Sequence, residues 1–133
     1  MASCDETWMH EALKEGCKAA EISAPNPAVG CVLVRDGKEL SRGHTQKPGG
    51  NHAEIEAIEA ARKAGLSVRG ATAYVTLEPC PMCAGAIINA RIPRVFYGAR
   101  DEAMGACGGV LNLFMERFPF RPALVGGILK DEC

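Results

Sequence analysis

The feature that most constrains the fold is a run of almost entirely apolar residues, Ala28 to Val34, with the sequence AVGCVLV. Short apolar runs with β-branched residues are typical of strands that are covered on both faces. The Asp36-Gly37 pair that follows is a turn signal, so Lys38 to Gly43 is expected to return as an antiparallel strand. A hairpin of this kind needs other elements on both sides of its sheet.

Helix and strand patterns alternate along the rest of the chain. Apolar residues at helical spacing predict helices from about Asp5 to Ile22, from His52 to Ala64, from Cys80 to before Pro93, and from Val110 to Phe118. Further strands are expected at Ala71–Leu77, Arg94–Ala99 and Ala123–Leu129. The order α-β-β-α-β-α-β-α-β predicts an α/β fold, a three-layer α/β/α sandwich with helices on both faces of the sheet.

Length and composition suit one compact domain. The chain has 133 residues, of which 47% are hydrophobic and 23% charged, and these values exclude the disordered and fibrous classes. Because there is no repeat, low-complexity stretch or linker, residues 1–133 are expected to form a single domain. The formal net charge of −1 gives no overall attraction to nucleic acid, although a local basic patch can still exist.

The chain carries no sign of export or membrane insertion. No run approaches the ~18 consecutive apolar residues of a membrane span. Charged residues such as Glu6, Glu11 and Lys14 interrupt the first apolar stretch, which a signal peptide would not allow. Seven cysteines, an odd number, favour free thiols in a reducing compartment. We therefore expect a cytoplasmic protein with no membrane partner.

Two short segments carry residues that bind metals and move protons: His52-Ala53-Glu54 and Pro79-Cys80-Pro81-Met82-Cys83. Each is expected to open a helix after a loop or strand, and two such N-termini beside one sheet could meet. Cys80 near the N-cap and Cys83 about one turn later can point to one spot. The positive end of the helix favours the thiolate, which is the form that binds metal.

These residues predict one catalytic zinc site. His52, Cys80 and Cys83 would give Zn²⁺ three protein ligands and leave an open position for water, which is the catalytic pattern. Zinc can lower the pKa of bound water to roughly 7, and Glu54 could take its proton and pass it to a departing amine. His-x-Glu followed by Pro-Cys-x-x-Cys is a known signature of zinc deaminases. Domain 1–133 is therefore interpreted as a zinc-dependent hydrolytic deaminase.

Simpler interpretations compete with this one. A Cys-x-x-Cys pair alone could be a thiol redox motif, and the ligands alone could form a structural zinc site. A structural site has no need of the Glu54 carboxylate. A non-catalytic zinc module that serves a partner subunit therefore stays as a lesser alternative.

The whole chain resembles the cytidine deaminase-like superfamily. Residues 24–31, 43–46 and 49–54 resemble the riboflavin-pathway pyrimidine deaminase domain, whereas residues 80–88, 98–101 and 126–133 resemble bacterial tRNA adenosine deaminase. The resemblance implies a five-stranded mixed sheet between helices, one zinc per subunit and usually a homodimer. It also implies that Asn26 contacts the substrate ring and that the backbone around Glu78 faces the amine.

Other residues are candidates for contact with the substrate. Ala53 lies between the two chemical residues of the first motif. His44 is interpreted as a loop or pocket-wall residue rather than a second metal ligand, because three ligands already suffice. Asn26, between two prolines, could instead only shape a turn. Asp101 could cap the following turn or touch the ligand.

Departures from both relatives bear on the substrate. The riboflavin branch has a longer segment between its cysteine ligands than Pro81-Met82. The tRNA branch has Gly-Trp-Asn where this chain has Gly43-His44-Thr45, and Asn-His where it has Pro119-Phe120. Extruding a base from RNA costs a few kcal/mol, which a free compound does not incur. The first expectation is therefore a small aminopyrimidine or aminopurine compound, and the alternative is the anticodon loop of tRNA, deaminated from adenosine to inosine.

Overall fold

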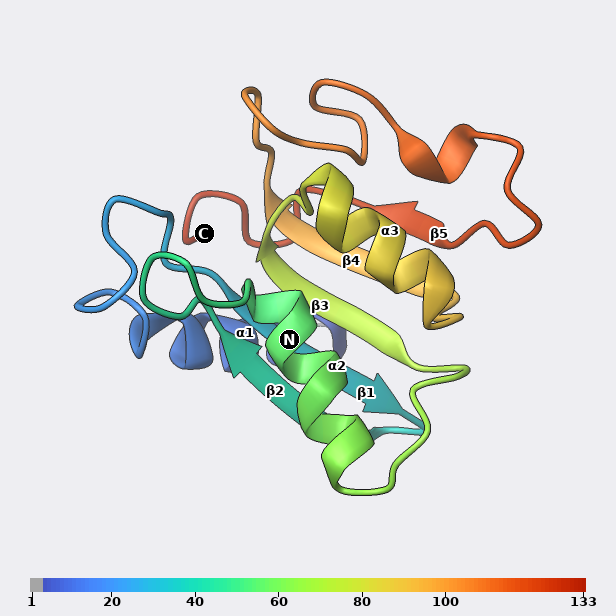
Figure 1. Cartoon of the computed structure of the whole chain (residues 1–133), viewed down its shortest axis with the longest axis horizontal. Coiled ribbons are helices and arrows are strands. Elements are labelled where there is room, and N and C mark those ends of the chain that lie inside the picture. Colours follow the sequence, from blue (N-terminus) through green and yellow to red (C-terminus); the bar gives the residue numbers. More distant parts are fainter. Residues whose placement is uncertain (1–3) are drawn as a thin grey trace.

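The computed structural model describes residues 4–133 as a five-stranded mixed sheet between helices on both faces (Figure 1). The strands are β1 (Gly30–Arg35), β2 (Lys38–His44), β3 (Thr72–Leu77), β4 (Arg94–Ala99) and β5 (Ala123–Val125). The helices are α1 (Cys4–Cys17), α2 (Ala53–Lys63), α3 (Pro81–Asn89) and the 3₁₀ helix η1 (Leu113–Met115). The α/β/α sandwich expected from the sequence is confirmed.

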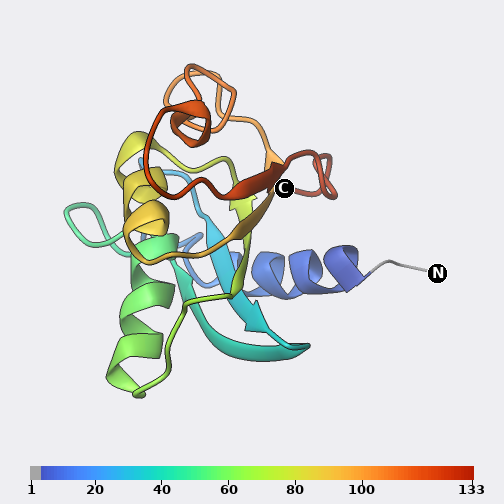
Figure 2. The same ribbon diagram turned by 90° about the vertical axis from the view of Figure 1, so that its right-hand side faces the viewer.

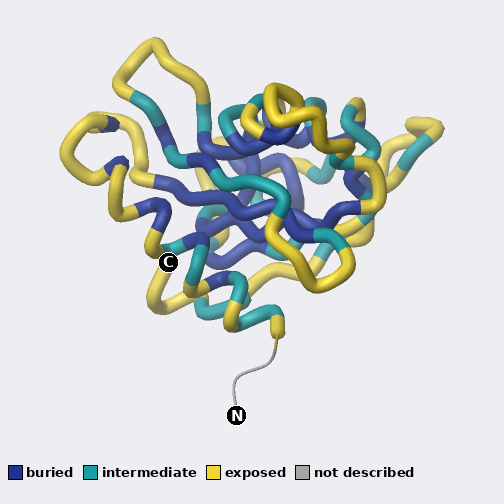
Figure 3. The backbone as a smooth tube through the Cα atoms, turned by 90° about the horizontal axis from the view of Figure 1, so that it is seen from below, coloured by how far each residue is buried: buried dark blue, intermediate teal, exposed yellow. Residues whose placement is uncertain are grey.

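Strand β1 is covered on both faces, as its apolar sequence predicts. Figure 2 shows α1 on one side of the sheet and α2 and α3 on the other. Side chains alternate along a strand, so Val32 and Val34 pack in one cluster with Met9 of α1. Cys31 and Leu33 point to the opposite side and belong to the larger cluster that includes residues of α2 and α3. The buried residues accordingly run through the middle of the molecule, with the exposed ones in the outer loops (Figure 3).

The order of the strands places the segments that follow β3 and β4 at the same edge of the sheet. The order is β2-β1-β3-β4-β5, in which β1 is antiparallel to β2 and β3 while β3, β4 and β5 are parallel. Leu77 at the end of β3 pairs with Ala99 at the end of β4. The segments that leave these two strands therefore start side by side, and such a carboxyl edge of parallel strands is a common place for a ligand site.

Three expected elements differ from the structure. Helix α1 ends at Cys17 rather than near Ile22, because residues 18–20 donate to carbonyls three residues back and form turns. Strand β5 ends at Val125, before Gly126 and Gly127, and the backbone of Gly127 has a φ of 84° that interrupts an extended strand.

The helix expected from Val110 to Phe118 is reduced to η1. The Asn112 side chain accepts a hydrogen bond from the Phe114 N–H at 3.0 Å, a local contact that competes with a longer helix. Phe114 is buried, whereas Val110, Leu111 and Phe118 are exposed. The apolar residues of this region are therefore divided: Phe114 belongs to the core, Leu113 packs against it partly buried, and the other three lie at the surface.

All seven cysteines lie within residues 4–133 and are free thiols. Cys31, Cys83 and Cys107 are buried, and Cys80 is half-buried. Within the same residues, none of the helices has the length and apolar character needed to traverse a bilayer.

Candidate metal and catalytic site

The structure brings the three expected zinc ligands together. The Nδ1 atom of His52 lies 3.6 Å from the Cys80 sulfur and 3.5 Å from the Cys83 sulfur. All three ligand atoms lie within 4.8 Å of one another. With Zn–N and Zn–S bonds of about 2.1 and 2.3 Å, a tetrahedral zinc ion would separate its nitrogen and sulfur ligands by about 3.6 Å. The distances from the His52 nitrogen to the two sulfurs therefore match those of a tetrahedral zinc site.

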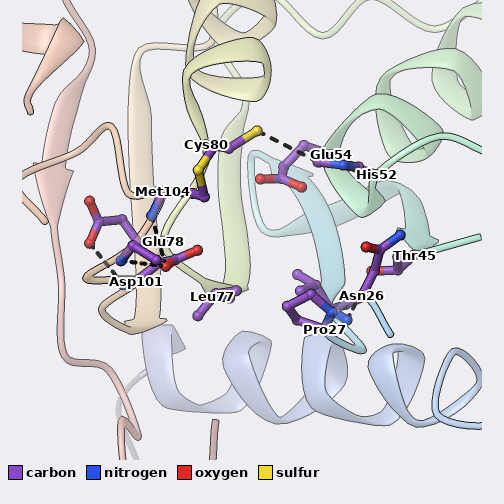
Figure 4. Close-up of a pocket in the computed structure, with 12 residues that line it drawn as sticks. Asn26, Pro27, Thr45, His52, Glu54, Leu77, Glu78, Cys80, Asp101 and Met104 are labelled. Atoms are coloured by element: carbon purple, nitrogen blue, oxygen red, sulfur yellow. Dashed lines mark hydrogen bonds between the residues drawn. The ribbon is translucent and has the colours of Figure 1, made fainter. Parts of the chain in front are cut away.

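This geometry follows from the way in which two helices begin. His52 is the N-cap of α2 and Cys80 is the N-cap of α3, and both have extended backbone angles. Neither side chain makes a capping hydrogen bond, so each is free to turn toward a ligand. Pro81 occupies the first turn of α3, where its missing N–H costs no hydrogen bond. Because α2 and α3 lie on the same face of the sheet, their N-termini meet (Figures 1 and 4).

The two thiols shift each other's pKa in opposite directions. A hydrogen bond from Cys83 lowers the pKa of Cys80 to about 5. The same hydrogen bond and burial raise the pKa of the Cys83 thiol. Metal binding requires both sulfurs as thiolates, so it must displace the Cys83 proton.

Glu54 lies beside these ligands, in the first turn of α2. Its side chain is 5% exposed, and burial is the main cause that raises its pKa to about 7. A carboxyl group with such a pKa can both accept and return a proton near neutral pH. Figure 4 shows the Glu54 carboxylate next to His52 and directed into the pocket.

The site opens into a pocket of about 350 Å³. This volume is within the range of roughly 300–1,000 Å³ that is usual for small-ligand sites. Its polar lining consists of Asn26, Thr45, His52, Glu54, Glu78, Cys80 and Asp101. Its apolar lining consists of Pro27, Val29, Leu77, Ala103 and Met104. A flat ring with polar edges, such as a nucleobase, suits this combination of walls.

The predicted substrate contacts fall into two groups. Asn26, Glu78 and Asp101 line the pocket. Ala53 is fully buried and is absent from the lining. The ring of His44 faces the helix α1, with its Nδ1 atom 2.5 Å from the Glu15 carboxylate, and is also absent from the lining. Contact of any of these five residues with a substrate stays a prediction.

Several pocket residues were not expected from the sequence. Thr45 follows β2, and its hydroxyl accepts a hydrogen bond from the Val29 N–H at 3.0 Å, which joins two pocket walls. Leu77 is the last residue of β3, and Met104 lies in a turn of the segment that follows β4. A local signal existed only for Leu77, which lies two residues before the cysteine motif, because the other contacts depend on tertiary packing.

Comparison with known sequences identifies the family. The family model described as "Cytidine and deoxycytidylate deaminase zinc-binding region" matches residues 2–99. The tRNA-specific adenosine deaminase of Bacillus subtilis (strain 168) is 43% identical over 136 residues, which cover 97% of this chain and 83% of that protein. The riboflavin biosynthesis protein RibD of Escherichia coli (strain K12) is 44% identical over 103 residues, 73% of this chain but 27% of that protein.

Solved structures give the same assignment. A diaminohydroxyphosphoribosylaminopyrimidine deaminase/5-amino-6-(5-phosphoribosylamino)uracil reductase from Thermotoga maritima has a TM-score of 0.85 at 36% identity, covering 97% of this chain and 38% of that one. A structure from work on A-to-I editing by tRNA deaminases at the wobble position has a TM-score of 0.80 at 37% identity, covering 95% of this chain and 96% of that one. The chain is a zinc deaminase that belongs to the cytidine and deoxycytidylate deaminase family.

Proposed function

We propose that this enzyme deaminates adenosine to inosine in the anticodon loop of tRNA. The observation that carries the proposal is the extent of similarity to the tRNA-specific adenosine deaminase of B. subtilis, 43% identity over 97% of this chain and 83% of the relative. This similarity supports tRNA, the alternative substrate in the sequence analysis, better than the small aminopyrimidine or aminopurine compound that was expected first.

The residues of the pocket suit hydrolytic removal of an amine. His52, Cys80 and Cys83 would hold a zinc ion, and the chemistry that zinc would supply there is a lower pKa of water, toward about 7, which makes the water a nucleophile. Glu54 accepts the proton of the attacking water and returns it to the leaving amine, which departs as ammonia. Burial of its carboxyl group keeps the proton exchangeable near neutral pH.

The shape of the pocket suits a base taken out of a loop. A base that reacts inside RNA must leave its stack, at a cost of about a few kcal/mol that is smallest for unpaired positions. The pocket here is open to the surface, and half-exposed Asp101 and exposed Met104 form part of its entrance. An anticodon nucleotide could therefore enter while the rest of the loop stays outside.

The test is deamination of an anticodon stem-loop whose wobble nucleotide is adenosine. We expect inosine in the product with zinc-loaded enzyme, far slower formation of inosine with the Glu54→Gln variant, and none with a stem-loop that carries guanosine at that position. Binding should weaken as salt rises, because phosphate contacts release counterions. Absence of inosine at saturating RNA and low salt would refute this substrate.

A small aminated pyrimidine is the second candidate. It is supported by the TM-score of 0.85 with the T. maritima deaminase/reductase and by 44% identity to E. coli RibD over 103 residues. A panel of aminopyrimidine and aminopurine bases, nucleosides and nucleotides tests it by mass spectrometry, through replacement of an amino group by oxygen. Turnover of a panel member with no inosine in RNA would select this candidate.

Two further expectations from the sequence stay predictions. A homodimer is the expected assembly, and light scattering of the zinc-loaded protein measures it. A non-catalytic zinc module requires that Glu54→Ala be silent in every assay, so any loss of turnover in that variant with an intact fold excludes the module.

A further inference from the structure

The carboxylate of Glu78, a residue that lines the pocket, is hydrogen-bonded to the segment that follows β4. It is 2% exposed and accepts hydrogen bonds from three backbone N–H groups. Its Oε1 atom accepts from Asp101 at 3.2 Å, and its Oε2 atom accepts from Cys107 at 2.9 Å and from Gly109 at 2.7 Å. Glu78 therefore connects the end of β3 to the segment of residues 101–109.

Two glycines allow this close approach. A Cβ atom added at Gly105 would lie 2.3 Å from Glu78 Oε2, and one added at Gly109 would lie 2.7 Å from Glu78 Oε1. At both positions the Cβ atom would also lie 2.4 Å from the carbonyl oxygen of Asp101. All these distances are far shorter than a normal contact between carbon and oxygen, so any side chain at either position would disturb the packing of the segment against Glu78 and against its own turn. The segment therefore fits Glu78 in two ways: its backbone donates hydrogen bonds to the carboxylate, and glycine stands at the two positions closest to it.

The same segment forms one wall of the pocket. The backbone carbonyl of Asp101 accepts a hydrogen bond from the Gly105 N–H at 2.9 Å. The Oδ1 atom of the Asp101 side chain accepts hydrogen bonds from the N–H groups of Ala103 and Met104, at 3.0 Å each. Asp101, Ala103 and Met104 all line the pocket (Figure 4). Of the two roles foreseen for Asp101, capping the following turn is the one that these bonds perform.

We propose that Glu78 is a positioning residue: it holds segment 101–109 in place and thereby sets the wall that contacts the substrate. This inference requires deaminase activity, which the family provides, but not a particular base. It assigns no proton transfer to Glu78. The side chain acts on substrate binding through Asp101, Ala103 and Met104.

The variant Glu78→Gln tests the proposal with minimal change in shape. Whichever way the amide is turned, its NH₂ group faces at least one backbone N–H that needs an acceptor, so part of the segment loses its attachment. We expect KM to rise on the order of tenfold and kcat to fall by less than about threefold, with zinc content unchanged. A merely structural defect would lower the active fraction, and hence kcat, without raising KM.

Hydrogen exchange supplies a readout that needs no substrate. The amides of Cys107 and Gly109 should exchange faster in Glu78→Gln, whereas amides of β1 should keep their protection. If deamination proves to act on a base other than adenosine in tRNA, these measurements still apply with the base that is turned over, so the two proposals can fail separately.

A second variant disturbs the same contact from the other side. Gly105→Ala keeps the carboxylate but places a methyl group against it and against the Asp101 carbonyl, which belongs to the same pocket wall, and we expect the same rise in KM. Gly85→Ala is the matched control, because a Cβ at Gly85 in α3 meets no atom within 4 Å. That variant should behave as the unmodified enzyme.

The outcomes decide the matter in each case. A rise in KM in both Glu78→Gln and Gly105→Ala supports the proposal. An unchanged KM with lower kcat in both, or unchanged exchange at Cys107 and Gly109, overturns it. If Glu78→Gln does not fold, Gly105→Ala decides alone by the same criteria.

Discussion

At the scale of a single residue, Glu54 is both buried and close to the metal ligands. It lies two residues after His52 in the first turn of α2, and burial raises its pKa to about 7. We expect Glu54→Gln to lower kcat by about 10²- to 10⁴-fold, the usual contribution of a general acid–base group. Single-turnover release of ammonia measures the loss.

Elemental analysis of the same Glu54→Gln preparation is the control, and it should find as much zinc as in the unmodified enzyme. If the variant turns over substrate at the normal rate with its metal bound, Glu54 is not the proton carrier.

The sequence predicted the chemical residues better than the pocket around them. His52, Cys80 and Cys83 could be predicted as ligands because they belong to two short motifs with a characteristic spacing. Each of these motifs lies at the start of a helix. The three side chains come together only because both helices lie on the same face of the sheet. The sequence was compatible with that arrangement but did not predict it. The position of His44 could not be inferred, because its partner Glu15 lies in a distant helix.

At the scale of the elements, a polar contact fastens α1 to β2. Although burial raises the pKa of Glu15, hydrogen bonds from His44 and Lys18 outweigh it, and the net pKa lies below its ordinary value of 4.5. A carboxyl group whose folded pKa is depressed stabilises the fold above its unfolded pKa, and this stabilisation is lost as the pH falls through the folded value.

Glu15→Gln should therefore destabilise the protein at pH 7 by about 1–3 kcal/mol, since the Glu15 side chain is almost buried and its contact with His44 is part-buried. The difference from the unmodified protein should shrink as the pH falls below 4.5, the ordinary value for this carboxyl group. Urea unfolding at a series of pH values measures it. Glu11→Gln, one turn earlier in α1 and more exposed, is the control and should cost about 0–1 kcal/mol. A gap that stays constant with pH would contradict the assigned charge.

The elements themselves were predictable where burial dictates the pattern. Strand β4 runs from Arg94 to Ala99 as expected, and β1 is apolar because helices cover both of its faces. The helix predicted for residues 110–118 was wrong, although the apolar residues of this region occur at helical spacing. Their backbone instead follows the segment held by Glu78, and η1 retains only three residues of the expected helix.

At the scale of the whole molecule, the metal site joins α2 and α3 at the edge where β3 and β4 end. The unfolded chain does not preserve this geometry, so zinc binds the folded state far more strongly and stabilises it by mass action. With free zinc at about 1,000 times its Kd, the stabilisation is about 4 kcal/mol.

Removal of zinc by a chelator should therefore lower the melting temperature, and added zinc should restore it. Calorimetry with and without the chelator measures the shift. Cys83→Ser should melt at the lower temperature and be insensitive to chelator, because it lacks a ligand. Cys17→Ser, at the exposed end of α1, should respond like the unmodified protein. If the protein melts at the same temperature after elemental analysis shows that its zinc has gone, the metal does not hold the two helices together, and the cysteines would serve chemistry alone.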